Sequence, residues 1–296
     1  MNPLQLPESV RSRVAGTVVV SALFPGAGHF LLGRAVQGVI WFVAVQALLF
    51  GGIALAQGSQ LDYGTWFQIG DLRLVFLLLP EMGNFLGTQV AAGLFHSVEL
   101  GGTQPQEIPL RELGYIMSGA AGILAAFAAA HAAGIALATS LSAPGRRPHP
   151  GTAALASLLV PGLGHLLTGR RFKGYLLGGT VLGLFLLGMA LGDFADMDRQ
   201  RHPYYWAGQM MLGGVGWVVG LFTSSLRFER LLPFQDAGLL FVTTSGLFVV
   251  IVSLDAWHRA AQDWAAAAGL GKDSTDEPDE TTATSASAVV LEGEPA

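Results

Sequence analysis

The stretch "FPGAGHFLLGR" (Phe24–Arg34) interrupts a strongly apolar region with a proline, glycines and a histidine, and "VPGLGHLLTGR" (Val160–Arg170) nearly repeats it. Proline cannot continue the interior of a helix, and glycine permits positive φ and close approach of backbones. We therefore expect the same local structure twice: a helix, a tight glycine turn near a membrane surface, and a second helix folded back on the first.

Both copies fit the pattern P-G-x-G-H-x-x-x-G-R-x-x-x-G, and we assign its residues a structural role. An arginine at the edge of an apolar segment can extend to lipid headgroups, and the last glycine offers a flat face to a neighbouring helix. The residues are Pro25, Gly26, Gly28, His29, Gly33, Arg34 and Gly38 in the first copy, and Pro161, Gly162, Gly164, His165, Gly169, Arg170 and Gly174 in the second.

The composition indicates a membrane protein. Of 296 residues, 51% are hydrophobic and only 12% are charged, against roughly 25% charged in soluble domains. The net charge of −5 argues against nucleic acid as a partner. The absence of cysteine excludes disulfides and thiolate chemistry. We expect the lipid bilayer as the main partner and other membrane proteins as further partners. Because arginine far outnumbers lysine, we expect a GC-rich bacterial source and the inner membrane.

Apolar segments long enough to suggest membrane spans define the expected fold class. A span needs about 20 residues. The Pro-Gly punctuation divides two of the segments, which are either short spans or re-entrant elements. We expect six to eight spans, and favour eight, in an all-α polytopic protein with two tandem repeats of three to four helices each. The segments are 14–32, 36–57, 74–96, 113–138, 152–168, 173–192, 204–224 and 236–257.

A proline-rich linker, "LSAPGRRPHPG", separates the two expected repeats. A second similarity aligns Gly114 with Gly238 and Gly122 with Gly246, which favours duplication of a whole multi-span unit. Lysine and arginine are too evenly distributed to fix the orientation. The expected organisation is an N-terminal segment 1–13, a first membrane repeat 14–140, the linker 141–151, a second membrane repeat 152–258, and a polar, acidic, disordered tail 259–296.

The stretch "GAGHFLLGRAVQG" resembles the helical hairpin of the TM-two domain family, in which a short loop joins two transmembrane helices. The duplicated form is similar to uncharacterised bacterial multi-pass families. The aromatic pair of that hairpin is reduced to Phe30-Leu31 in the first copy and to Leu166-Leu167 in the second, and the Asp-Arg-Phe loop triplet is missing. The resemblance implies a membrane hairpin and no particular activity.

The glycines and histidines of the motif do not match a known chemical site. Leu31 stands where a dinucleotide-binding loop needs its third glycine. His29 and His165 could meet across a pseudo-two-fold axis, but two imidazoles are too few for a stable zinc site. Alternatively, each histidine bonds loop carbonyls at a helix end or lies at an interface. We therefore predict no catalytic residue, no cofactor and no metal.

Glu81 and Asn84, within "LVFLLLPEMGNFLGTQV", are the candidate polar residues inside the membrane. An ionisable residue at membrane depth is a functional candidate because burying its charge is costly. Alternatively, Pro80-Glu81 marks a break or an interfacial loop, and Glu81 lies in water. The corresponding stretch of the second half, "MMLGGVGWVVG", has no acidic residue.

Three functional hypotheses follow from these features. The first is a non-enzymatic membrane protein with a structural or interaction role, because glycine-rich packing faces abound and ionisable groups within the apolar segments are scarce. The alternative is a small-solute transporter or channel with its site between the two repeats, motivated by the duplication and by Glu81. The third is an intramembrane enzyme that uses His29 or His165.

Overall fold

The computed structural model shows an almost entirely helical protein, which confirms the predicted all-α class. Its only strands among the described residues form one antiparallel hairpin, in which Thr65 pairs with Phe76. The residues described are 6–63, 65–70, 72–76, 80–99, 108–141, 147–226 and 232–270. Most of the predicted tail lies outside them.

The elements fall into two halves on either side of the predicted linker. The first half contains α1 (Glu8–Leu23), α2 (Ala27–Leu31), α3 (Ala35–Leu55), the 3-10 turn η1 (Ser59–Tyr63), strands β1 (Thr65–Ile69) and β2 (Leu72–Phe76), the 3-10 turn η2 (Pro80–Asn84), α4 (Phe85–Glu99) and α5 (Arg111–Leu141). The second half contains α6 (Pro150–Leu159), α7 (Leu163–Leu167), α8 (Arg171–Leu191), α9 (Pro203–Met210), α10 (Gly214–Thr223) and α11 (Gln235–Ala267).

Four described helices are long and apolar enough to cross a membrane: α3, α5, α8 and α11. The favoured number of eight spans is therefore wrong for the described part of the chain. Pro25 divides the first expected segment, and residues 74–96 form β2, η2 and α4 instead of one helix. Residues 204–224 divide into α9 and α10 at Gly213, whose φ is +72°. Hydropathy is high across these breaks, but proline and positive-φ glycine end the helices.

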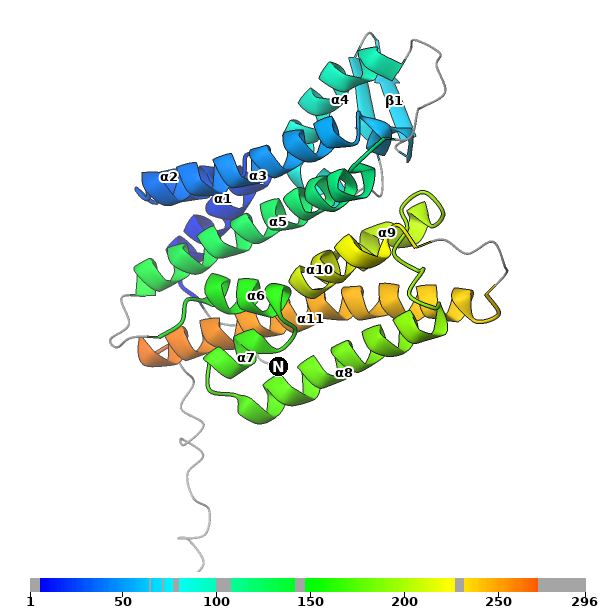
Figure 1. The fold of residues 1–296 in the computed structure, drawn as a ribbon. Coiled ribbons are helices and arrows are strands. Elements are labelled where there is room, and N and C mark those ends of the chain that lie inside the picture. The colour runs from blue at the N-terminus through cyan, green and yellow to red at the C-terminus, as the bar shows by residue number, and fades with distance from the viewer. Residues whose placement is uncertain are drawn as a thin grey trace, which may run out of the picture.

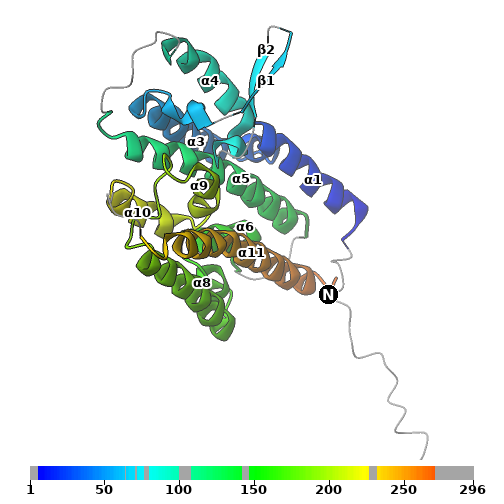
Figure 2. The ribbon, with the colours of Figure 1, turned by 90° about the vertical axis from the view of Figure 1, so that its right-hand side faces the viewer.

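The two halves lie one above the other, with α3 and α5 in one layer and α8 and α11 in the other (Figures 1 and 2). Figure 1 shows α3 and α8 running in the same direction, and α5 and α11 running in the opposite direction. We call the end of the bundle where α3 and α8 begin, beside Arg34 and Arg170, the motif end. We call the end where these two helices finish, at Leu55 and Leu191, the loop end.

Glycines allow the long helices of each half to cross closely at the loop end. A Cβ atom on Gly52 of α3 would lie 2.6 Å from the carbonyl oxygen of Gly114 on α5. A Cβ atom on Gly188 of α8 would lie 2.9 Å from the carbonyl oxygen of Gly238 on α11. Both contacts are too short for a side chain, so these crossings depend on glycine.

Apolar clusters lie within and between the two halves, and the outer faces of the long helices remain apolar and exposed. Val45 and Leu49 of α3 pack in the first half, and Phe185 and Val249 pack in the second. The exposed rows include Val36, Val39, Ile40 and Val43 on α3, and Leu240, Leu247, Ile251 and Leu254 on α11. Apolar faces of this kind on helices of spanning length suit contact with lipid tails. The four long apolar helices and their exposed apolar faces therefore indicate a membrane protein.

The boundaries of the predicted segments differ from those of the helices. α5 ends at Leu141 and α6 begins at Pro150, within the predicted linker, whose residues 142–146 lie outside the described ranges. The last helix continues beyond the predicted boundary at residue 258 and ends at Ala267. Trp264 and Ala265 of this extension are buried, so packing continues into residues that were expected to be a polar tail.

Candidate functional site

The two copies of the motif form two helix-breaking turns of the same geometry. Gly26 begins α2 with φ +89°, and Gly162 begins α7 with φ +83°. A Cβ atom on Gly26 would overlap the carbonyl oxygen of Gly38, and one on Gly162 would overlap that of Gly174. The proline ends the first helix, and the left-handed glycine then turns the chain onto the start of the long helix that follows.

Further bonds at each turn are equivalent. The Gly28 N–H donates to Ser21 Oγ at 3.0 Å, and the Gly164 N–H donates to Ser157 Oγ at 3.1 Å. Gly33 and Gly169, which precede the motif arginines, both have positive φ. Ser21 and Ser157 therefore satisfy the backbone donor of the second residue in α2 and α7, one of the donors that a helix start leaves unpaired.

The α6–α7 pair enters the bundle and returns to the same end. Arg147 precedes α6 and Arg170 follows α7, yet both bind Asp263: Arg147 Nη1 donates to its carbonyl at 2.7 Å, and Arg170 donates to both carboxylate oxygens at 2.7 and 3.0 Å. Between these points, the carbonyl of Leu158 lies against Gly213, at the turn between α9 and α10. This arrangement is the re-entrant alternative for the Pro-Gly segment.

The motif histidines are fully buried, and each pairs with the last long helix of its own half. His29 Nε2 lies 2.9 Å from His131 Nδ1 on α5, and His165 Nε2 lies 2.7 Å from Asp255 Oδ2 on α11. Among the described residues, His29 and His165 do not pair with each other, and no group of three or more metal-ligating side chains occurs. The histidine contacts join helices, as the interfacial alternative expects.

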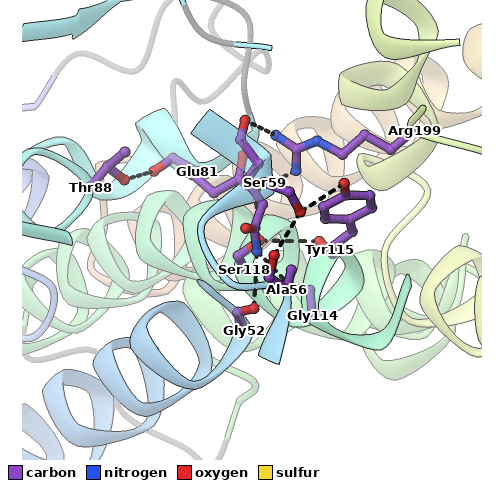
Figure 3. Close-up of polar contacts among 10 residues, drawn as sticks. Gly52, Ala56, Ser59, Glu81, Thr88, Gly114, Tyr115, Ser118 and Arg199 are labelled. Atoms are coloured by element: carbon purple, nitrogen blue, oxygen red, sulfur yellow. Dashed lines mark hydrogen bonds and ion pairs between the residues drawn. The ribbon is translucent and has the colours of Figure 1, made fainter. Parts of the chain in front are cut away.

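Glu81 lies in η2 and is 1% exposed, so it is neither in the middle of a spanning helix nor in water. Its Oε1 accepts a hydrogen bond from Arg199 Nη1 at 2.6 Å. Arg199, also 1% exposed, belongs to the loop between α8 and α9. The ion pair therefore joins the first half to the second inside the protein (Figure 3).

A set of polar contacts holds this ion pair from both sides. Ser118 Oγ donates to Glu81 Oε1 at 2.6 Å, and Arg199 Nη2 donates to the carbonyl of Gln60 at 3.3 Å. The guanidinium lies 5.1 Å from the ring centroid of Tyr115, which adds a cation–π contact. The carboxylate and the guanidinium thus have several partners in place of water, which a buried ion pair requires.

Glycine also positions η2. Gly122 of α5 lies directly beneath Pro80, where a Cβ atom would overlap the proline carbonyl oxygen. This close approach brings Glu81 beside Ser118, one turn earlier on α5. Thr88 Oγ1 then donates to the backbone carbonyl of Glu81 at 2.8 Å and connects η2 to the helix that follows it.

Asn84 is buried but belongs to a separate contact. Its Nδ2 donates to Gln46 Oε1 on α3 at 3.0 Å. The structure therefore brings Glu81 together with Arg199, Ser118 and Gln60, while Asn84 connects η2 to α3.

Sequence reasoning missed Arg199, Gln60 and Ser118 as members of the site. Arg199 lies in the charged run "DFADMDRQRH", which sits between two apolar segments and looks like an ordinary exposed loop. The sequence offered one signal for this ion pair: an acid without an evident partner in the first half, and several charged residues in one connecting loop of the second half. Pairing them required knowledge of how the halves pack.

Together these features define a helical membrane protein with two matching helix-breaking turns and a buried ion pair between its halves. The chain belongs to a family of unknown function, DUF6677, which it matches over residues 17–144 and 152–266. The interruption between the matched ranges falls at the connection from α5 to α6. No curated protein and no solved structure matches the chain.

Proposed function

We propose that the protein is a non-enzymatic membrane protein with a structural or interaction role, whose two halves act as one rigid unit. The observation that carries this proposal is the buried Glu81–Arg199 ion pair between the halves. Breaking such a pair leaves an uncompensated buried charge, so the halves resist separation. We place the protein in a bacterial inner membrane, on the strength of its composition.

We further propose that the halves are tandem repeats built on TM-two-like hairpins. Support comes from α2 and α7, and from α3 and α8, which have the same lengths and the same spacing along the chain. Support also comes from the matching turns at Gly26 and Gly162. The shared direction of α3 and α8 (Figure 1) supports parallel rather than inverted repeats.

An interaction role is supported by a glycine face on α8. A Cβ atom on Gly179 or Gly183 would meet no atom of the described residues within 4 Å, and both glycines are exposed. Their G-x-x-x-G spacing, flanked by exposed Leu176 and Leu186, is typical of surfaces where transmembrane helices of different proteins pack closely.

Reconstitution of the purified full-length protein into liposomes tests the structural role. We expect ion and small-solute flux at the level of protein-free vesicles. A selective flux that Glu81→Gln abolishes, while the protein stays folded, would reject the structural role and favour the alternative of a transporter or channel.

That alternative rests on the interrupted helices. The α6–α7 turn and the α9–α10 turn meet inside the bundle at Leu158 and Gly213. Broken helices that meet at depth form the substrate sites of many transporters. The flux measurement above therefore distinguishes the two functions directly.

A further inference from the structure

A second buried acid, Asp196, lies at the loop end and has no role in the Glu81 network. It belongs to the loop between α8 and α9 and is 0% exposed. Neither of its carboxyl oxygens has a hydrogen-bond partner among the residues that the structure describes. Among the ion pairs of the described residues, none includes Asp196, whereas Glu81 is paired with Arg199.

The fold is built to hold this carboxyl in place. It lies in a notch formed by Gly192 and Gly238, where a Cβ atom on Gly238 would be 2.6 Å from Asp196 Oδ2 and one on Gly192 would overlap the carboxyl group. Asp193 and Phe194 have φ of +49° and +62°, which turns the chain back onto the end of α8. Positive φ at two consecutive non-glycine residues is costly and marks a conformation that the surrounding structure imposes.

Backbone contacts fix the turn from both sides. The Phe194 N–H donates to the carbonyl of Met189 at 2.8 Å. The side-chain Nε2 of Gln209, on α9, donates to the backbone carbonyl of Asp196 at 2.9 Å. The carboxyl group is therefore enclosed by the end of α8, the start of α11 and α9.

The first half places a neutral amide where the second half places Asp196. α3 ends in the same turn as α8: Gln57 and Gly58 have positive φ, and the Gly58 N–H donates to the carbonyl of Ile53 at 2.9 Å. Three residues after Gln57 comes Gln60, just as Asp196 comes three residues after Asp193. Gln60 Nε2 donates to the carbonyl of Gly52 at 3.0 Å, at the crossing of α3 and α5.

This comparison indicates which form of the Asp196 carboxyl suits its surroundings. The position beside a close helix crossing is filled by a neutral hydrogen-bond donor in the first half. Only the protonated carboxyl can donate, and only that form avoids the cost of burying a charge without a counterion.

The pKa of Asp196 depends first on burial and then on the charge of Asp193. Burial, and then the negative field of Asp193, raise the pKa of Asp196 to about 7. Asp236 lies in the first turn of α11, and His202 immediately precedes α9. The last turn of α8 carries no charged side chain, and Asp193 follows shortly after the helix.

We propose that Asp196 is a proton-binding site, which holds its proton while the loop of residues 192–202 is closed over Gly192 and Gly238. When the loop moves away and water enters, the carboxyl O–H bond breaks, the proton passes to water and the carboxylate remains. This inference is independent of the structural role proposed above, because it requires neither flux nor a partner.

Infrared titration of the full-length protein in detergent tests the site. The pH runs from about two units below to about two units above the expected midpoint. We expect a carbonyl stretching band of a protonated carboxylic acid that disappears with a midpoint near pH 7. We expect Asp196→Asn to remove this band, and Asp193→Asn to keep it but lower its midpoint, because the neighbouring negative charge is gone. Asparagine tolerates the positive φ at residue 193.

Three results would overturn the proposal. The band could be absent throughout the titration, or it could persist unchanged in Asp196→Asn. Finally, a midpoint that moves when sodium replaces a bulky organic cation would identify a metal-cation site instead of a proton site. Asn resembles a neutral carboxyl in shape, and the circular dichroism spectrum of Asp196→Asn verifies that the variant is folded.

Discussion

At the scale of single residues, two of the buried acids, Glu81 and Asp196, lie in different surroundings. Glu81 has a full counterion in Arg199, whereas Asp196 has a glycine notch and no cation within ion-pair distance among the described residues. The first acid therefore contributes to holding the halves together, and the second responds to pH. The difference follows from the partners of each carboxyl, since both are equally inaccessible to water.

Removing one partner of the central ion pair is expected to be strongly destabilising. Glu81→Gln or Arg199→Met should each cost about 3–5 kcal/mol, because either leaves a buried polar group without its partner. The double variant should cost less than the sum of the two. Denaturant unfolding in detergent, followed by tryptophan fluorescence, measures these changes.

Asp263→Asn is the matched control for the ion-pair variants. Its pair with Arg170 has two good hydrogen bonds, but the two side chains are 28% and 41% exposed. A pair as exposed as this contributes about 0–1 kcal/mol. Equal losses from the buried and the exposed pair would contradict the account of Glu81.

The stability of the protein is expected to fall with rising pH because of Asp196. Its folded pKa of about 7 lies above the ordinary pKa of an aspartate, 3.8, so the folded state holds a proton that the unfolded state has released. The stabilisation is complete below the unfolded pKa and is lost as the pH rises through the folded pKa. As the pH rises from about 4 to about 8, the Tm of the wild type should therefore fall relative to the Tm of Asp196→Asn. A difference that does not vary with pH would contradict a raised pKa.

Residue-level prediction from the sequence succeeded only in part. Glu81 stood out because a charge in an apolar run is visible by itself. Arg199, 118 positions away, could not be assigned to it, since nothing local in the sequence encodes that contact. Asp196 stood in a loop rich in charge, and only the packing of Gly192 and Gly238 distinguishes it from its exposed neighbour Asp193.

At the scale of elements, the helix-breaking turns and the glycine crossings set the shape of each half. The turns depend on Gly26 and Gly162, which adopt positive φ, and on Gly28 and Gly164, which pack against the preceding helix. Local chemistry of this kind is readable from the sequence, because proline and glycine act on their own neighbours. For that reason the position of each turn could be predicted before its tertiary contacts were known.

Gly164→Ala is expected to destabilise the second turn. Its Cβ atom would overlap the carbonyl oxygen of Ala153, so backbone must move. We expect a loss of about 1–3 kcal/mol, typical of overpacking in a dense core. Thermal unfolding in detergent measures the loss.

Gly16→Ala serves as the control for the turn. A Cβ atom on Gly16, in the exposed face of α1, would meet nothing within 4 Å. There the change should leave stability equal or raise it by about 0.5–1 kcal/mol, as alanine is the better helix former. If Gly164→Ala behaves in the same way, the close contact between α6 and α7 is not a feature of the protein.

Helix continuity was the property that hydropathy could not predict. The segment 74–96 is apolar along most of its length, yet it contains the end of β2, all of η2 and most of α4. Pro80 and the approach of η2 to Gly122 divide it. A window of high hydropathy indicates that a segment avoids water. It does not indicate whether the segment forms one continuous helix.

At the scale of the whole molecule, the two halves together contribute four long helices, and the α6–α7 pair enters and leaves the bundle at one end. Arg147 and Arg170, on either side of α6–α7, both bind Asp263 and so lie together at the motif end. Gln57 and Asp193, just after α3 and α8, lie at the loop end. With eight complete spans, Arg147 would instead share a side with Gln57 and Asp193.

Single-cysteine labelling of the chain in intact membrane vesicles is the most direct test, because the parent sequence contains no cysteine. The variants are Ala35→Cys, Arg147→Cys, Arg171→Cys, Gln57→Cys and Asp193→Cys, all at exposed positions. We expect a membrane-impermeant maleimide to label positions 35, 147 and 171 from one side, and positions 57 and 193 only from the other. Labelling of position 147 together with 57 and 193 would contradict the four-span, re-entrant architecture.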